Sequence, residues 1–178
     1  MVYLAFYKVT NRHAHLDDKL IAWWTSEKKI LGKFNGDWRE GFSHCELVID
    51  NIMYSSSPRD GCVRSYPHTF NTDVWHYDKI GVNDKEKEML KRLFDQHEGK
   101  KYDYLGVAGF VIPFIGHSED RWFCSEICTE ALRTINHPAT RRLVPNKTSP
   151  VKLATAIRKY VNAMEIYNNY KIPTPNNL

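Results

Sequence analysis

The sequence predicts a single α+β domain, because segments with strand periodicity and segments with helix periodicity both occur along its 178 residues. Residues 2–9 are rich in Val, Tyr and Phe, and residues 43–57 alternate as two strands joined by a turn do. Apolar residues recur at helical spacing over residues 84–97 and 123–135. We therefore expect a small antiparallel sheet packed against helices.

Turn and capping residues set the limits of the other elements. Asp50-Asn51 tolerates the left-handed backbone of a tight hairpin, Asn83 or Asp84 can cap a helix that Gly99 ends, and Pro150 suits a first helical position. In chain order we expect a strand over 2–9, a helix over roughly 18–31, two strands within 43–57, short strands near 62–66 and 73–78, a helix over 84–97, a short helix over 102–112, a helix from 124, and a last helix from 150 to about 163. We find no internal repeat and no linker, so we expect one domain over residues 1–165. The polar, proline-bearing end of the sequence predicts a tail over residues 166–178.

Composition narrows the function classes. Hydrophobic residues make up 42% of the chain and aromatic residues 13%, as in a chain with a packed core. The net charge is only +4, and the lysines and arginines are scattered among acidic residues and do not form a block, which argues against a nucleic-acid partner. The first residues lack the features of a signal peptide, and no apolar run reaches the roughly 18 residues of a membrane span, so we expect a cytoplasmic protein.

The four cysteines predict free thiols. They are too few and too irregularly spaced for a disulfide scaffold, and the pair at 124 and 128 lacks the spacing of a zinc knuckle. A loop with His13, His15, Asp17 and Asp18 is a weaker candidate for a metal cluster. We expect neither a metal nor a cofactor.

Two polar side chains share one face of the first hairpin strand. Alternation places His44 and Glu46 on one face and Cys45 on the other. With Asp50-Asn51 as a two-residue loop, Glu46 pairs with Ser55 and His44 with Ser57, which gives one polar patch. The alternative is an ordinary solvated strand face.

Cys124 is the candidate nucleophile, because it stands where a loop gives way to a helix. The unpaired N–H groups and partial positive charge of a helix N-terminus stabilise a thiolate. Cys128 falls one turn later, in the apolar stripe, where we expect an inert buried thiol. The alternative for Cys124 is likewise a buried structural cysteine.

Four segments together resemble the permuted NlpC-type branch of the papain-like superfamily, which includes YiiX-like amidases and the lecithin–retinol acyltransferase group. They are SHCELVI (43–49), SSSPRDGCVR (55–64), GKKYDYLGV (99–107) and CSEICTEAL (124–132), and a late TSPVKLA (148–154) also fits. In this branch the histidine strand precedes the cysteine helix, which is the order found here. Small phage and bacterial members are the most similar, so a phage origin would place the protein in the infected host cell.

The resemblance implies a role for each candidate residue. Cys124 would be the nucleophile and His44 the general base. The family's third polar residue falls on Ser55, which cannot neutralise an imidazolium, so we expect Glu46 to orient His44, with Ser55 as the alternative. Tyr102 would donate to the oxyanion or line the substrate cleft, unless it is only a core aromatic.

These roles predict a thiol hydrolase that cleaves an amide through an acyl-enzyme. Its substrate would be a peptide, a peptidoglycan fragment or a lipid-like acyl compound. One alternative is a lipid-directed acyltransferase or thioesterase, and another is an inactive binding module on the same scaffold. The sequence leaves the substrate and the oligomeric state open.

Overall fold

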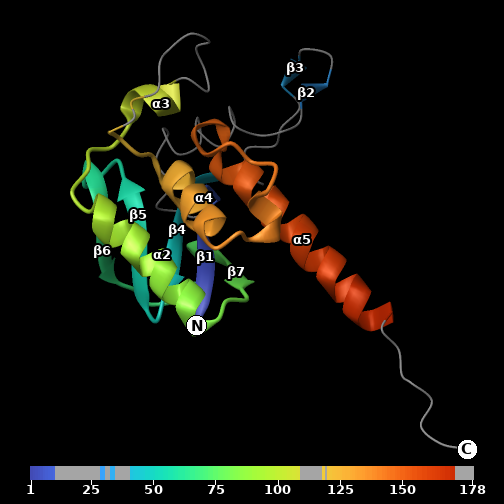
Figure 1. Cartoon of the computed structure of the whole chain (residues 1–178). Helices are drawn as coiled ribbons and strands as arrows, with labels where there is room; N and C mark the ends of the chain where they lie inside the picture. The colour runs from blue at the N-terminus through green and yellow to red at the C-terminus, as the bar shows by residue number, and fades with distance from the viewer. Residues whose placement is uncertain (11–28, 31–32, 35–40, 109–117, 119, 171–178) are drawn as a thin grey trace, which may run out of the picture.

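A computed structural model of the chain has the predicted α+β class (Figure 1). It describes residues 1–10, 29–30, 33–34, 41–108, 118 and 120–170, the side chains of 29–30, 33–34 and 166–170 excepted. The expected metal-binding loop around His13 and His15 lies outside the described residues.

The main sheet has five antiparallel strands in the order β6-β5-β4-β1-β7. Asp50 and Asn51 join its β4–β5 hairpin with φ values of 48° and 66°, so the predicted tight turn is confirmed. The strands are β1 (Val2–Lys8), β4 (Phe42–Ile49), β5 (Ile52–Ser57), β6 (Cys62–Pro67) and β7 (Trp75–Ile80).

One predicted element ends differently in the structure. The expected helix over 18–31 lies largely outside the described residues, but its last part is wrong. β2 (Lys29–Ile30) pairs there with β3 (Lys33–Phe34) in a separate two-stranded sheet. Gly32 in the connecting sequence disfavours a helix and suits a turn.

The helices follow the expected order with shifted ends. Asn83 caps the start of α2 (Asp84–His97), because its side chain accepts a hydrogen bond from the Glu86 backbone N–H. α4 (Cys124–Thr134) begins at the predicted cysteine. α3 (Tyr104–Ala108) starts later than expected, and α5 (Pro150–Tyr170) continues past the expected end near 163, since neither Gly nor Pro interrupts it. Two short 3₁₀ turns, η2 (Pro138–Thr140) and η3 (Pro145–Lys147), connect α4 to α5. Within the described part of the chain, no helix is long and apolar enough to cross a bilayer.

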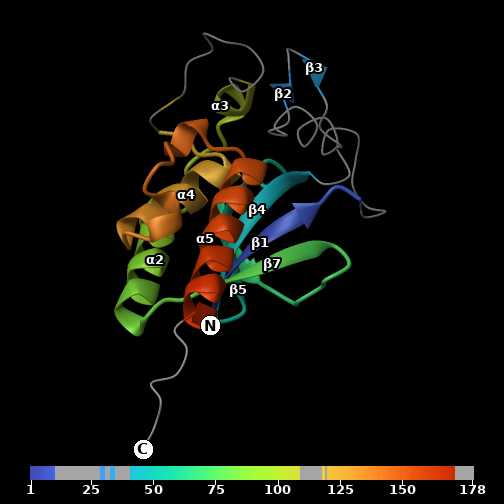
Figure 2. The same cartoon turned by 90° about the vertical axis from the view of Figure 1, so that its right-hand side faces the viewer.

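Helices α2, α4 and α5 all cover the same face of the sheet, as the two perpendicular views show (Figures 1 and 2). The core lies between this helix layer and the sheet. Its largest fully buried apolar side chains are Leu4, Phe6, Leu47, Ile49, Leu90, Phe94, Phe123, Ile127, Leu132, Leu153 and Ile157.

The other face of the sheet carries a different set of side chains. Tyr7 is the cross-strand partner of both His44 and Trp75, so the three share a face. Phe6 and Cys45, one residue along, belong to the core on the helix side. The sheet therefore separates an apolar interior from a face rich in aromatic and polar groups.

The helix–sheet core supplies a test of the fold. Replacing the fully buried Leu132 by Ala should lower the free energy of unfolding by about 2–5 kcal/mol, because a cavity remains where the side chain packed. Leu105→Ala makes the same change at a side chain that is 55% exposed and should cost less than about 0.5 kcal/mol. Urea unfolding measures both, and equal effects would contradict the assigned core.

Candidate active site

Strands β4 and β5 separate just before they reach His44. Their ladder runs from Ile49–Ile52 to Leu47–Tyr54 and ends there. Beyond it, the Ser55 hydroxyl donates a 2.8 Å hydrogen bond to the Cys45 carbonyl oxygen.

This separation changes the expected polar patch. Ser55 is fully buried and bonds to the backbone of Cys45 and Ser56, so its side chain is used for holding the strands together. The expected pairs Glu46–Ser55 and His44–Ser57 are not part of the ladder. The side chain that contacts the His44 ring is Glu46.

The start of α4 is held against the end of β5. The Ser56 hydroxyl donates a 2.6 Å hydrogen bond to the Trp122 carbonyl oxygen. Tyr102 and Trp122 form a parallel bridge, and the Asp103 N–H also donates to the Trp122 carbonyl at 3.0 Å. These bonds fix the residues just before Cys124.

The Cys124 thiol is influenced by two consecutive residues of β4. The side chains of Cys45 and His44, which project to opposite faces of the strand, both act on the pKa of the thiol. The sulfur therefore lies where β4 has lost its β5 partner and both side chains can approach it. Cys124 itself is only 3% exposed.

These contacts favour the charged forms of both groups. A hydrogen bond from Cys45 and the positive charge of His44 hold the pKa of the Cys124 thiol well below its usual value, against the effect of burial. Burial alone would lower the pKa of His44, but the Cys124 thiolate and the Glu46 carboxylate raise it to about 10. Both shifts therefore favour the thiolate–imidazolium pair over the neutral thiol and imidazole.

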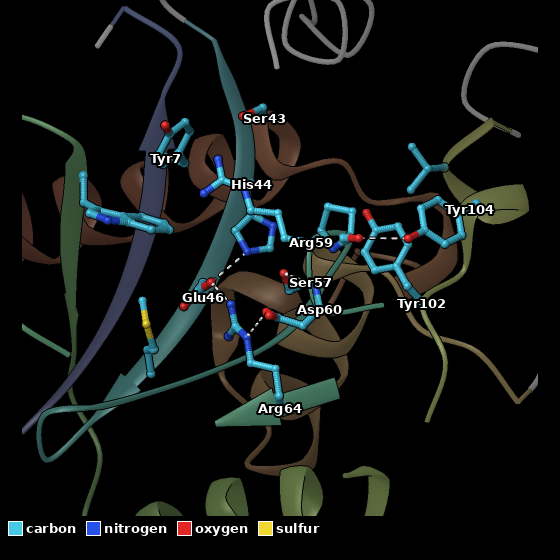
Figure 3. A pocket seen from close by; sticks show the side chains of 14 residues that line it. Tyr7, Ser43, His44, Glu46, Ser57, Arg59, Asp60, Arg64, Tyr102 and Tyr104 are labelled. Carbon is cyan, nitrogen blue, oxygen red and sulfur yellow. Dashed lines mark hydrogen bonds and ion pairs between the residues drawn. The ribbon is translucent and has the colours of Figure 1, made fainter. Parts of the chain in front are cut away.

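A chain of charges continues from His44 across the sheet (Figure 3). The Glu46 Oε1 atom lies 2.8 Å from His44 Nε2 and accepts a 2.6 Å hydrogen bond from Arg64 Nη2. Arg64 Nε in turn donates to Asp60 Oδ2 at 2.9 Å. Burial would raise the pKa of Glu46, but these two cations lower it, so Glu46 stays ionised although it is only 2% exposed.

Two further residues lie close to the thiolate. Burial, and then the negative charge of Cys124, raise the pKa of Tyr102 well above its usual value, so its hydroxyl keeps its proton. Burial and the neighbouring Asp103 raise the pKa of Glu126 to about 8, which makes Glu126 mostly neutral at pH 7. The Phe123 N–H donates to Glu126 Oε2 at 3.4 Å.

A cavity of about 670 Å³ opens beside His44 on the face of the sheet away from the helices (Figure 3). His44, Glu46 and Tyr102 line it, whereas Cys124 is buried and does not line it. The remaining lining residues are Tyr7, Ser43, Met53, Ser57, Pro58, Arg59, Asp60, Arg64, Trp75, Tyr104 and Val107. A ligand in this cavity would reach the thiol from the side of the His44 ring.

Arg64 can be read from the sequence, with Arg59 and Asp60, as a group that binds an anionic substrate, but its contact with Glu46 is not predicted there. Its partner Ser55 in the β5–β6 ladder places it on the strand next to the histidine hairpin. The signal for this contact is the alternation along residues 62–66 after the Asp60-Gly61 turn. It places Arg64 near Glu46 only if the register of the β5–β6 hairpin relative to the β4–β5 hairpin is also known. Among the described residues, no cluster of three or more His, Cys, Asp or Glu side chains could hold a metal.

Comparisons with known protein families, with curated proteins and with solved structures found no match to this chain. The functional assignment therefore depends on the geometry and charge of the site itself.

The Glu46 carboxylate should set the titration of His44. In Glu46→Gln the imidazolium loses its negative neighbour, so the pKa of His44 should fall by about one to three units. An NMR titration of the imidazole resonances measures the change. Glu88→Gln removes a carboxylate that is 70% exposed on α2 and should leave the His44 titration unaltered. Unchanged titration in Glu46→Gln would show that the carboxylate does not act on the ring.

The thiolate should react at a pH at which ordinary thiols do not. Between pH 8 and pH 6 the rate of glutathione alkylation by iodoacetamide falls by about 100-fold, because its thiolate fraction falls. The pKa of the Cys124 thiol lies well below its usual value, so its rate should fall much less over this range than the rate of glutathione. Separate tryptic peptides carry Cys45 and Cys62, and fragmentation of the peptide over residues 122–133 in the mass spectrometer distinguishes Cys124 from Cys128. A rate that follows glutathione would contradict the ion pair.

Proposed function

We propose that the protein is a cysteine-dependent hydrolase that cleaves an amide bond through an acyl-enzyme, with Cys124 as nucleophile. The observation that carries the proposal is the His44–Glu46 contact together with the electrostatic interaction between His44 and Cys124. A thiolate, a proton donor beside it and a group that orients the donor are the parts that nucleophilic catalysis needs.

The first half of the reaction forms the acyl-enzyme. The Cys124 thiolate attacks the carbonyl carbon, and the electrons of the C=O bond move to the oxygen. The backbone N–H groups at the start of α4 and the Tyr102 hydroxyl are donors available to this oxyanion. Collapse of the intermediate expels the amine, which takes the proton from the His44 imidazolium.

The second half releases the acyl group. Neutral His44 now accepts a proton from water, and the hydroxide equivalent attacks the thioester carbon. Cys124 leaves as the thiolate, and the His44 imidazolium is restored beside it. Glu46 holds the ring through Nε2 in both halves, so Nδ1 is the nitrogen that can face the sulfur and the water.

The permuted papain-like scaffold remains part of this proposal. The order of a histidine strand followed by a cysteine helix, with the helix packed on an antiparallel sheet, agrees with that scaffold. Ser55, which the resemblance places third, instead holds Cys45, and the carboxylate two residues after the histidine contacts the ring.

Charged side chains in the cavity favour a polar substrate over a lipid. Glu46, Arg59, Asp60 and Arg64 all line the space beside His44. Burying these groups under an acyl chain would remove their hydration without replacing it. The same contacts support an active site over a binding module, since a buried carboxylate on the histidine has no evident use in binding alone.

Removing the sulfur tests the proposal directly. Cys124→Ala should lower the hydrolysis rate of p-nitrophenyl acetate, an activated acyl donor, by at least about a thousandfold, with no acetyl adduct by mass spectrometry. Hydrolysis of a panel of peptidyl aminocoumarin amides should disappear in the same variant.

The matched control is Cys128→Ala, one helical turn further along α4. It should keep both activities and form the acetyl adduct at residue 124. Circular dichroism establishes that each variant is folded. Undiminished hydrolysis in folded Cys124→Ala would refute the mechanism.

A further inference from the structure

We propose that the substrate carries a carboxylate, and that Arg59 binds it at the mouth of the cavity beside His44. This inference rests on the proposed thiol hydrolase and adds the chemical class of its substrate. It depends on the position of Arg59, on the charges around it and on the aromatic wall of the cavity.

Arg59 reaches from the turn after β5 over the cavity. Its guanidinium carbon lies 5.9 Å from the centre of the Tyr7 ring, and Figure 3 shows its tip close to Tyr7 and His44. Contact between a guanidinium and an aromatic face holds the group in place and leaves its N–H edges open. These edges present the paired donors that match a carboxylate.

Among the described residues that line the cavity, every other charged side chain already has a partner of opposite charge. Glu46 contacts His44 and Arg64, and Arg64 also contacts Asp60. Arg59 makes no hydrogen bond or ion pair with the residues that the structure describes. Arg59 is therefore the cation that a ligand can engage without breaking an existing pair.

The surrounding charges select a monoanion. From Cys124 through His44, Glu46 and Arg64 to Asp60 the signs alternate, and the series begins and ends on an anion. It is thus negative overall and would repel a phosphate dianion beside Arg59. A single carboxylate instead forms a charge-assisted pair with the guanidinium while adding little repulsion.

The apolar part of the cavity leaves room for the rest of the substrate. Tyr7 and Trp75 meet edge to face with ring centres 5.2 Å apart, and Trp75 lies 6.2 Å from the His44 ring. Tyr104 and Val107 line the space as well. A volume of about 670 Å³ suits a compound of drug-like size with an apolar or aromatic group near the carboxylate.

A pair of matched alkylating agents tests the inference at the thiol itself. Iodoacetate carries a carboxylate, and iodoacetamide is its neutral counterpart with the same leaving group. The quantity measured is the ratio of their rate constants at Cys124, divided by the same ratio for glutathione. Arg59→Gln should lower this normalised ratio by at least about tenfold, because an ionic hydrogen bond is lost.

Arg142→Gln is the matched control. It removes the same charge at an exposed position that does not line the cavity, so the ratio should stay within about twofold of the unmodified protein. If Cys124 is alkylated and the ratio is insensitive to Arg59, the carboxylate site is refuted while the thiol chemistry stands. If Cys124 reacts with neither reagent, the proposed hydrolase fails.

A binding measurement decides the carboxylate site even if the thiol is inert. In Cys124→Ala, 3-phenylpropanoate should bind at least about tenfold more tightly than 3-phenylpropanamide. Calorimetry measures both affinities, and the intrinsic tryptophan fluorescence, to which Trp75 in the cavity contributes, gives a second measurement. Arg59→Gln in the same background should abolish the difference. Equal affinities for the acid and the amide in Cys124→Ala would overturn the inference.

Discussion

The structure of the site depends on one buried carboxylate. Glu46 is 2% exposed and ionised, and an isolated charge in that position would cost several kcal/mol. His44 and Arg64 offset this cost from two sides. Because Arg64 belongs to β6 while His44 belongs to β4, the orientation of the imidazole depends on the register of two hairpins.

The backbone links this charge network to the thiol. The Tyr102 N–H donates to the Gly61 carbonyl at 2.7 Å, and the Trp122 N–H donates to the Lys101 carbonyl at 3.1 Å. The segment around Tyr102 therefore joins the turn that carries Arg59 to the residues that precede Cys124. In the proposed mechanism, a displacement of that turn would therefore alter both the substrate contact of Arg59 and the position of Cys124.

Patterns among residues close together in sequence predicted most of the described helices and strands, but they did not predict the contacts between these elements. The Asp50-Asn51 hairpin, the Asn83 cap and the helix from Cys124 each depend on residues close together in sequence. The role assumed for Ser55 required the β4–β5 ladder to continue, but α4 enters where the strands separate. The Arg64–Glu46 contact requires the mutual arrangement of two hairpins, which alternation within one strand does not determine.

Two buried acids, Asp103 and Glu126, lie near the start of α4. Asp103 is fully buried and accepts hydrogen bonds from the backbone N–H groups of Gly106 and Ser118, at 2.9 Å and 3.3 Å. A Cβ atom at Gly106 would lie 2.5 Å from the Asp103 carboxylate, so glycine is needed for this close approach.

Glu126 responds to the same charge by keeping its proton. An acidic residue in the first turn of a helix is usually stabilised as the anion, but here burial and Asp103 raise its pKa to about 8. At neutral pH the first turn of α4 therefore carries a neutral Glu126 beside the Cys124 thiolate. The positive end of the helix and the His44 imidazolium then act mainly on the sulfur, which is the proposed nucleophile.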